Sequence, residues 1–361
     1  MGATIGNNLK ITIFGESHGD SIGIVIDNLP AGLELDFDKI NAEMLRRAPG
    51  RDDTSTPRKE PDIPNIVSGI FNGRTTGAPL CAFIQNTNKH SSDYSEIKSK
   101  MRPSHADYTA YVKYRGFNDY RGGGHFSGRI TAPLVFAGAV AKQILNIQGI
   151  SIFSHIKSIK DITDKPFDCI NPDIKELEKL KMKPFPVLDE DVREKMHKII
   201  INARENQDSV GGVIECMIYG VKAGIGSPFF YSVESVLSHL LFSVPAVKGV
   251  EFGEGFDIAS RTARDVNDEM YVSESGVKTY TNHNGGVLGG ITNGMPVVFR
   301  TAIKPTPSVA AVQKTIDIDK MENCTLAVRG RHDPCIVLRA LPVIEAAAAI
   351  GICDLIDLQN L

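Results

Sequence analysis

The chain has 361 residues, of which 42% are hydrophobic and 23% charged, as in an ordinary soluble globular protein. This composition excludes intrinsically disordered and fibrous proteins. Forty Lys and Arg against 43 Asp and Glu leave a formal net charge of −3, so the chain has no overall basic surplus for nucleic acid or a membrane surface.

The first quarter of the chain predicts paired strands and one helix. Runs of Ile and Val indicate the strands, and an Asn72-Gly73 turn signal predicts that the last two form a hairpin. The helix has apolar residues at helical spacing, an Asp to cap its start and a Pro-Gly pair to end it. Residues 51–64 have no periodicity and predict a mobile surface loop. The predicted elements are strands over 10–14, 21–27, 65–71 and 78–85 and a helix over 36–47.

Helices predominate in the rest of the sequence. Glycines 122–124 separate a short helix from a long Ala-rich helix that we expect to be buried. Two amphipathic helices carry the main charge run and predict a solvated face without chemistry. A polar, glycine-rich stretch over 263–290 predicts an irregular functional or mobile loop. The predicted helices cover 106–114, 130–147, 173–183, 189–206, 232–241 and 342–358, and the predicted strands cover 212–221 and 296–302.

This mixture of elements lacks regular strand-helix alternation and therefore predicts an α+β fold, not a doubly wound dinucleotide-binding sheet. No linker divides the chain, so we expect one domain over 1–361. Six cysteines without a C-x-x-C pair indicate reduced thiols and no metal site. The longest nearly apolar run, 130–141, is shorter than the roughly 20 residues that a spanning helix needs. These features predict a cytoplasmic protein that binds neither nucleic acid nor membrane.

The turn G-E-S-H-G at 15–19 allows two interpretations. It matches the G-x-S-x-G nucleophile elbow of hydrolases, with Ser17 as the nucleophile, and it also places His18 in a tight turn. An elbow requires a helix directly after the serine, whereas residues 21–27 predict a strand. We therefore favour an exposed imidazole that exchanges a proton near neutral pH, with a plain structural turn as the alternative.

Basic side chains gather around the three successive glycines. Glycines let the backbone approach a ligand and expose its N–H groups, Ser127 adds a hydroxyl, and arginines supply planar forks suited to phosphate and carboxylate. The pattern favours an oxyanion pocket over nucleic-acid binding, and the alternative is a glycine hinge beside solvated arginines. The cluster contains Arg102, His105, Lys113, Arg115, Arg121, His125 and Arg129.

Two later segments add candidate phosphate-binding and proton-transfer groups. Segment 304–308, K-P-T-P-S, combines a rigid backbone with a cation and two hydroxyls, although a plain turn is the alternative. Segment 329–335, R-G-R-H-D-P-C, contains Asp333, a carboxylate that neighbouring arginines keep ionised and able to accept a proton. Cys335 beside His332 is interpreted as packing, because neighbours along the chain rarely align as nucleophile and base.

Taken in order, eight motifs of this sequence resemble the chorismate synthase family, from near residue 5 to beyond residue 345. They are G-E-S-H-G at 15–19, R-R-A-P-G at 46–50, R-P-S-H-A-D at 102–107, D-Y-R-G-G-G at 119–124, F-S-G-R at 126–129, P-A-V-K-G-V-E at 245–251, K-P-T-P-S at 304–308 and R-H-D-P-C at 331–335.

The resemblance implies an activity and a more specific fold. The family converts 5-enolpyruvylshikimate-3-phosphate to chorismate by anti-1,4-elimination of phosphate, the last step of the shikimate pathway, and requires reduced FMN although the reaction is redox-neutral. It implies a β-α-β sandwich, with helices between two antiparallel sheets, assembled as a homotetramer. Asp53 replaces a basic position that some members use near nicotinamide. This favours supply by an external flavin reductase over intrinsic NADPH-driven flavin reduction.

The resemblance also implies residue roles. His105 matches the histidine beside the substrate, His18 the histidine that protonates reduced flavin, and Asp333 the carboxylate that relays a proton through the flavin ring. The implied substrate-binding residues are Arg47, Arg102, Ser127, Arg129 and Arg331. The implied FMN-binding residues are Arg47, His125, Phe126, Ser127, His239, Leu240, Gly289, Lys304, Pro305, Thr306, Pro307, Ser308 and Arg331.

Two of these FMN positions depart from the family pattern. His125 stands where many members have Arg, and His239-Leu240 where an amide followed by a small residue is frequent. We therefore expect weaker or more pH-dependent FMN binding. A flavin- or phosphate-binding protein without lyase activity is the alternative function, against which the presence of His18, His105 and Asp333 argues.

Overall fold

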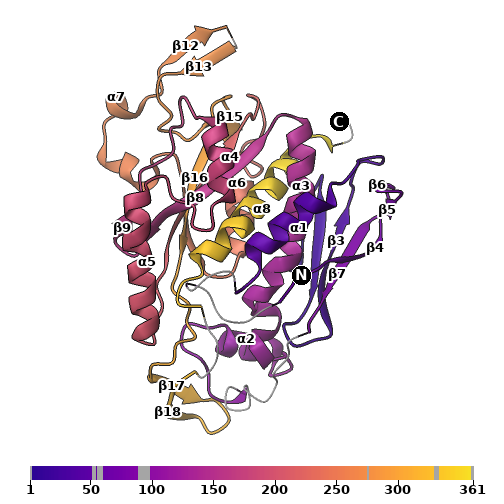
Figure 1. Ribbon diagram of the computed structural model, residues 1–361, viewed down its shortest axis with the longest axis vertical. Helices are drawn as coiled ribbons and strands as arrows, with labels where there is room; N and C mark the ends of the chain where they lie inside the picture. The colour runs from indigo at the N-terminus through magenta and orange to yellow at the C-terminus, as the bar shows by residue number, and fades with distance from the viewer. Residues whose placement is uncertain are drawn as a thin grey trace.

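The structure, a computed structural model, describes residues 2–50, 54, 60–87, 98–274, 276–328 and 333–358. This part of the chain forms a sandwich with helices between two five-stranded sheets (Figure 1). All strand pairs in both sheets are antiparallel, so the predicted α+β class and the implied β-α-β sandwich are confirmed. The first sheet has the order β1 (Thr4–Ile5), β2 (Lys10–Gly15), β3 (Ser21–Asp27), β7 (Leu80–Gln85), β4 (Asn65–Ser68). The second has the order β11 (Val247–Phe252), β16 (Val297–Ile303), β10 (Gly212–Tyr219), β8 (Ser151–Ile159), β9 (Ile162–Thr163).

The helices between the sheets bury the main hydrophobic core. Helix α3 packs on α8 and on the first sheet, while α8 also packs on β8 and β10 of the second. A Cβ on Gly138 would lie 2.2 Å from the Cβ of Ala346, so the approach of α3 to α8 requires glycine there. The N-terminal end of α3 follows the glycine segment 122–124 closely along the chain, so this packing also positions that segment. The inner helices are α1 (Phe37–Arg47), α3 (Thr131–Ile147), α6 (Val233–Ser243) and α8 (Val337–Leu355).

One predicted helix start and one length argument differ from the structure for identifiable reasons. Helix α8 begins at Val337 and includes Pro342, whose missing N–H costs a single hydrogen bond near the start of a long buried helix. The helical stretch Gly128–Ile147 is long and apolar enough to cross a membrane by length and composition, but 83% of its apolar window is buried inside the protein. It continues past Lys142 because that charge is paired in the interior.

Outer elements complete the molecule. Helices α4 (Ile174–Met182) and α5 (Glu190–Glu205) cover the far side of β8 and begin at Asp173 and Asp189, whose side chains accept backbone N–H groups. Figure 1 shows two hairpins at opposite ends of the long axis, β12 (Met270–Ser273) with β13 (Gly276–Thr279), and β17 (Gln313–Asp317) with β18 (Glu322–Leu326). The remaining elements are β5 (Ile70–Phe71), β6 (Arg74–Thr75), α2 (Asp107–Tyr114), η3 (Arg121–Phe126), η4 (Gly128–Ile130), η5 (Gly255–Ser260), α7 (Ala263–Val266), β14 (Val287–Leu288) and β15 (Ile291–Thr292).

Two predicted loops require correction. Stretch 263–290 is not irregular throughout, since it contains α7, the β12–β13 hairpin and β14. In stretch 51–64, positions 60–64 carry no helix or strand, as predicted, but Glu60 and Asp62 are buried whereas Pro61 and Ile63 are exposed. Ion pairs described below hold Glu60 and Asp62 inside, Thr54 is also buried, and the rest of 51–59 lies outside the described residues.

Candidate active site

Two histidines that are distant in sequence pack against consecutive glycines of η3. A Cβ on Gly122 would lie 2.3 Å from Cε1 and Nδ1 of His18, and a Cβ on Gly123 would lie 3.1 Å from Cε1 and 3.2 Å from Nε2 of His105. Both glycines have positive φ, +58° and +84°, which side chains rarely adopt. Backbone conformation and space therefore both require glycine here, and the result is a pair of imidazoles on one short backbone segment.

The turn that carries His18 joins β2 to β3 and is anchored to this glycine segment. The Ser17 N–H donates to the Gly124 carbonyl at 3.1 Å, and His125 Nδ1 lies 2.8 Å from the Gly15 carbonyl oxygen. Ser17 and His18 are only 2% and 4% exposed. The predicted exposed imidazole is thus wrong in its exposure. A strand follows the turn, which removes the nucleophile-elbow alternative.

His105 is held by the N-terminal end of α2. Its Nδ1 lies 2.6 Å from Oδ1 of Asp107, which also accepts from Nη2 of Arg102 at 2.8 Å. Burial works to raise the pKa of Asp107, but hydrogen bonds and charge from Arg102 and His105 outweigh it and hold that pKa well below its usual value. The carboxylate is therefore ionised, and Arg102 and His105 share it.

Arg47 and Arg129 meet at one buried carboxylate. Asp62 accepts from Arg47 Nη1 through one oxygen and from Arg129 Nη1 through the other, both at 2.6 Å, and Glu60 also accepts from Arg129. Arg47 further donates to the Gly128 carbonyl at 2.9 Å. Burial works to raise the pKa of Asp62, but the two guanidinium groups outweigh it and lower the pKa. The positive charges of Arg47 and Arg129 balance the negative charges of Glu60 and Asp62. An anionic ligand that binds these arginines would therefore take the place of a carboxylate.

Asn86 connects this charge cluster to the histidine turn. Its Nδ2 donates to the carbonyls of Glu16 at 3.0 Å and Gly19 at 2.9 Å, while its Oδ1 accepts from Arg129 Nε at 2.5 Å. Sequence analysis missed this residue. Its only sequence signal is a polar side chain directly after an apolar strand, which is too common to single it out.

The segment 304–308 lies against the His105 segment. Lys304 Nζ donates to the Ser104 carbonyl at 2.6 Å, and Arg102 Nη1 donates to Ser308 Oγ at 3.5 Å. Burial and the charge of Lys248 lower the pKa of Lys304. The hydroxyl of Thr306 is buried and has no hydrogen-bond partner among the described residues. A buried hydroxyl in this condition is available to a ligand.

Asp333 joins the same region through Arg339. Arg339 Nη1 donates to Asp333 at 2.5 Å, and its Nε donates to the backbone carbonyl of Arg47 at 3.3 Å. Burial raises the pKa of the Cys335 thiol to about 12, which supports its interpretation as packing. Arg331 and His332 lie outside the described residues.

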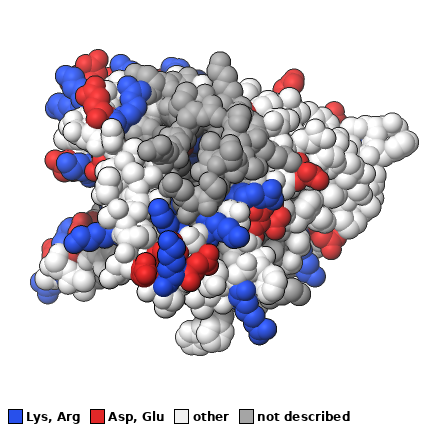
Figure 2. Space-filling model, turned by 90° about the horizontal axis from the view of Figure 1, so that it is seen from below, with Lys and Arg blue, Asp and Glu red and all other residues white. Residues whose placement is uncertain are grey.

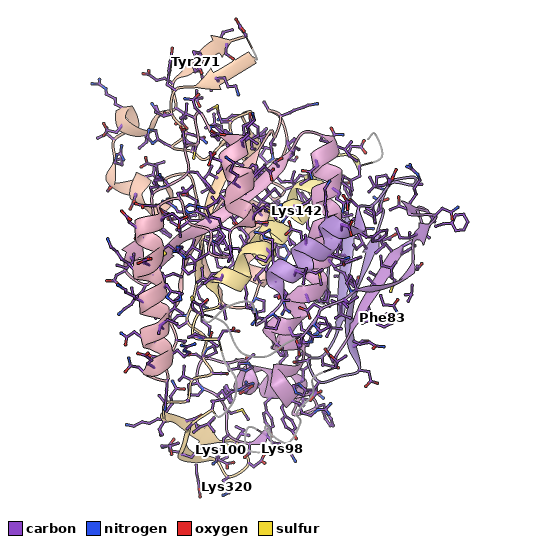
Figure 3. The ribbon with its side chains drawn as sticks, in the orientation of Figure 1. Phe83, Lys98, Lys100, Lys142, Tyr271 and Lys320 are labelled. Atoms are coloured by element: carbon purple, nitrogen blue, oxygen red, sulfur yellow. The ribbon has the colours of Figure 1, made fainter. Side chains whose placement is uncertain are left out.

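The end of the molecule that bears α2 also carries surface cations. Figure 3 labels Lys98, Lys100 and Lys320 there, beside the β17–β18 hairpin. Seen from below in Figure 2, Lys and Arg side chains lie on the described surface of this face, several of them beside Asp or Glu. The described arginines of the site are thus inside the protein, whereas its surface charge is mixed.

Comparison with known proteins shows the family of this chain. The family model described as chorismate synthase matches residues 9–356. A chorismate synthase of Thermococcus gammatolerans is 47% identical over 349 residues, which cover 97% of this chain and 96% of that protein. That of Dehalococcoides mccartyi strain BAV1 is 44% identical over 356 residues, covering 98% and 96%. The chain belongs to the chorismate synthase family.

A solved structure gives the same result for the fold. A crystal structure of chorismate synthase superimposes with a TM-score of 0.75 at 28% identity, covering 97% of this chain and 92% of that one. Chorismate synthases are carbon-oxygen lyases, so the predicted enzyme class is confirmed. None of these comparisons supports the alternative of a binding protein without lyase activity.

The chorismate synthase resemblance also implied FMN contacts at His239 and Leu240 on α6, and these two residues differ in exposure. Leu240 is 3% exposed and packs in the core, where a Cβ on Gly351 would lie 3.1 Å from its Cδ1. His239 is exposed. Near the end of α6, the carbonyl of Ala246 accepts the Lys304 N–H at 2.9 Å. Gly289 has nothing within 4 Å of a Cβ position and is open.

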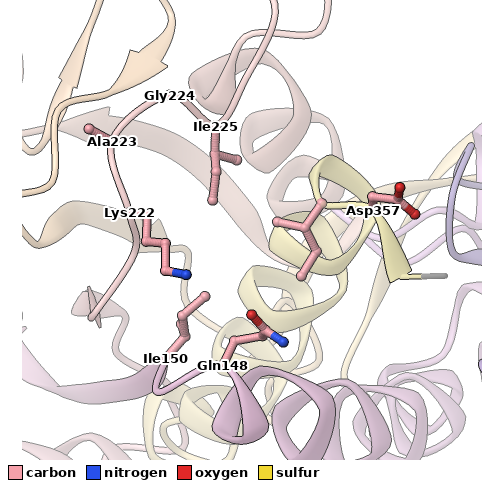
Figure 4. A pocket seen from close by; sticks show the side chains of 8 residues that line it. Gln148, Ile150, Lys222, Ala223, Gly224, Ile225 and Asp357 are labelled. Atoms are coloured by element: carbon pink, nitrogen blue, oxygen red, sulfur yellow. The ribbon is translucent and has the colours of Figure 1, made fainter. Parts of the chain in front are cut away.

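One cleft lies away from these residues. Its volume is about 280 Å³, and Gln148, Ile150, Lys222, Ile225 and Asp357 are among its lining residues (Figure 4). It adjoins the C-terminal end of α3, whereas Ser127 and Arg129 precede the N-terminal end. A helix of 17 residues is roughly 25 Å long, so the cleft is separate from the candidate active site.

Proposed function

We propose that this chain converts 5-enolpyruvylshikimate-3-phosphate to chorismate and phosphate by anti-1,4-elimination, with reduced FMN bound at the same site. One observation carries the assignment of the site: His18 and His105 pack on Gly122 and Gly123, inside a shell of buried arginines. Proton donors beside anion-binding groups are what the elimination of phosphate requires.

Arginines are the groups proposed to bind the substrate, which carries a phosphate and two carboxylates. Glu60 and Asp62 accept hydrogen bonds from Arg129, and Asp62 also accepts from Arg47. Substrate carboxylates or phosphate can take over these guanidinium donors if Glu60 withdraws. Arg102, Ser127 and Arg331 complete the proposed set, of which Arg331 lies outside the described residues.

The elimination breaks one C–H bond and one C–O bond. We assign proton donation to the departing phosphate oxygen to His105, and proton acceptance from carbon to Asp333. The electron pair of the C–H bond enters the new diene as the C–O electron pair leaves with phosphate, so the reaction is redox-neutral overall. Arg339 Nη1 donates to Asp333 at 2.5 Å and holds this carboxylate in place. His18, buried against Gly122, is the proposed second proton-holding group.

The residues around segment 304–308 fit a flavin phosphate. The partnerless Thr306 hydroxyl and the Lys304 ammonium provide a donor and a charge. When bound, reduced FMN supplies electron density that assists C–O cleavage and is recovered at the end of the reaction. The proposed contacts also include Arg47, His125, Phe126, Ser127, His239, Leu240, Gly289, Pro305, Pro307, Ser308 and Arg331.

We further propose a cytoplasmic homotetramer of single-domain protomers. An external flavin reductase would supply reduced FMN, and Asp53 in place of a basic residue argues against efficient use of NADPH by this chain alone. Size-exclusion chromatography with light scattering measures the oligomeric state directly.

The deciding experiment is an anaerobic assay with dithionite-reduced FMN and 5-enolpyruvylshikimate-3-phosphate, following chorismate absorbance and phosphate release. Activity is expected with chemically reduced FMN and not with NADPH and oxidised FMN. Asp333→Asn and His105→Ala should each retain the unfolding midpoint of the wild type and lose at least about 100-fold in kcat. Unchanged turnover in both variants would remove the roles assigned to these residues.

A further inference from the structure

Asp107 contacts both Arg102 and His105, although no role in binding or catalysis has been assigned to it. Its Oδ2 accepts from the backbone N–H of Arg102 at 3.0 Å and from Nε at 2.7 Å. Its Oδ1 accepts from Arg102 Nη2 at 2.8 Å and lies 2.6 Å from His105 Nδ1. The residue is 9% exposed and stands at the first position of α2. The arginine therefore fixes both carboxylate oxygens, and one of them faces the imidazole.

These distances determine which nitrogen of His105 carries a proton. Arg102 and His105 hold the pKa of Asp107 well below its usual value although burial opposes them, so the carboxylate is ionised and can only accept hydrogen bonds. A nitrogen 2.6 Å from such an oxygen must be N–H. Arg102 Nη2 also lies 3.1 Å from His105 Nδ1, but two donors cannot bond to each other, so Nη2 serves Asp107.

The other imidazole nitrogen then faces the glycine segment. Nε2 of His105 lies 3.2 Å from the position that a Cβ on Gly123 would take, and the His105 side chain keeps 15% of its surface exposed, so a ligand can approach the ring. We propose that Asp107 is a positioning residue that fixes His105 with its proton on Nδ1, so that Nε2 is the nitrogen that donates to the departing phosphate oxygen. This inference rests on the proposed role of His105.

The proton balance of this step is simple. An imidazolium with both nitrogens protonated donates the Nε2 proton to the phosphate oxygen as the C–O bond breaks and its electron pair leaves with phosphate. The neutral imidazole that remains keeps the proton on Nδ1, and this N–H continues to donate a hydrogen bond to Asp107. The other charged groups at this histidine are Arg102, bound to the same carboxylate, and Lys304, bound to the Ser104 carbonyl. A carboxylate partner of this kind fixes the orientation of the imidazole ring.

The test is a double-mutant cycle with Asp107→Asn and His105→Gln, assayed with reduced FMN. In the wild-type background, Asp107→Asn should lower kcat by about 100-fold and change the KM by less than about threefold. In the His105→Gln background, the same substitution should change kcat by less than about twofold. Equal losses in the two backgrounds would overturn the positioning role. Full activity of His105→Gln alone would instead overturn the proposed role of His105.

A second measurement reads the tautomer itself. Solid-state ¹⁵N spectra of histidine-labelled protein, with His105 assigned by the signals missing in His105→Gln, should show Nδ1 protonated in the wild type. Asp107→Asn should remove that preference, and a wild-type spectrum with Nδ1 unprotonated would overturn the proposal. If Asp107→Asn does not fold, Asp107→Glu keeps the charge but moves the carboxylate by one methylene, and it should lower kcat with an unchanged unfolding midpoint.

A remote Asp→Asn substitution provides the control. Asp173 caps α4 and accepts the N–H groups of Lys175 and Glu176 at 3.0 and 3.2 Å, on the outer side of the second sheet. Asp173→Asn should leave both kcat and the histidine spectrum unchanged.

Discussion

Two consecutive arginines at the end of α1 enter different clusters of buried charge. Arg46 donates to Glu345 through two nitrogens at 2.7 Å, inside the helix layer. Arg47 donates to Asp62 at 2.6 Å, toward the glycine segment and the histidines. The core cluster consists of Glu43, Arg46, Lys142, Lys181 and Glu345. The site cluster consists of Arg47, Glu60, Asp62 and Arg129.

The two clusters differ in what carries their carboxylates. Glu43 and Glu345 lie on α1 and α8, and Lys142, labelled in Figure 3, lies on α3 between them. Glu60 and Asp62 lie on irregular backbone before β4. A carboxylate on a packed helix cannot leave its partners without disturbing the core, whereas one on irregular backbone can give way to an anionic ligand. Ion pairs between arginine and carboxylate therefore stabilise the fold in the core cluster, whereas in the site cluster they hold arginines that can be transferred to the substrate.

The largest expected effect comes from breaking the core cluster. Glu345→Ala leaves Arg46 and Lys142 buried without their shared carboxylate and should lower the free energy of unfolding by about 3–5 kcal/mol in urea denaturation. Glu34→Gln, at an exposed pair with Arg74, should cost at most about 1 kcal/mol. Equal losses in the two variants would mean that burial gives the core cluster no special importance.

Cutting the connection between the site cluster and the histidine turn should affect catalysis more than stability. Asn86→Ala removes a buried acceptor of Arg129 and two donors to the turn, so kcat/KM should fall by about 10- to 100-fold, which corresponds to roughly 1.5–3 kcal/mol. Asn206→Ala, at the exposed end of α5, serves as the control and should leave kcat/KM unchanged. A fall in stability as large as that of Glu345→Ala, with kcat/KM unchanged in the folded fraction, would contradict the assignment.

Weakening the competing carboxylate tests the exchange directly. Glu60→Gln should lower the substrate KM by about fivefold, or roughly 1 kcal/mol, because Arg129 then has one fewer anionic partner to exchange. The kcat should stay within about twofold. Steady-state kinetics over a range of substrate concentrations gives both values, and a higher KM would show that Glu60 helps to bind substrate.

A third buried cluster adds to the comparison of the core and site clusters, because its cation is a histidine, which changes its charge with pH. His155 lies between Asp164 at 3.1 Å and Glu215 at 3.0 Å. Burial works to lower the pKa of His155, but the two carboxylates outweigh it and raise that pKa. The stabilisation is therefore fully present below about pH 6.5, the unfolded value, and is lost as pH rises through the folded pKa. Wild-type unfolding free energy should fall by up to about 1 kcal/mol between pH 6 and 9, and His155→Gln should remove this dependence.

Local sequence patterns determined much of the secondary structure. The strands β2 and β3, the capped helix α1 and the buried helix α3 were all predicted from spacing and capping residues. Strand β8 was missed, because Ser154 and His155 interrupt its apolar pattern. Their polar atoms are satisfied only by Glu345, Asp164 and Glu215, which come from other elements.

For the site, the motifs supplied the cations and the tertiary structure supplied their partners. The order of eight motifs identified the family and assigned roles to His18, His105 and Asp333. Spacing along the chain could not show that Gly122 and Gly123 each receive one histidine, nor that the described arginines are paired with carboxylates.

The sequence by itself therefore determined the family, the α+β class and the residue types of the chemistry, because motifs, periodicity and capping are local properties. Only the tertiary structure decided that Arg46 belongs to the core and Arg47 to the site, and that Asp107 shares its carboxylate between Arg102 and His105. The physical reason is that buried charges are stable only with partners, and these partners come largely from segments that folding brings together.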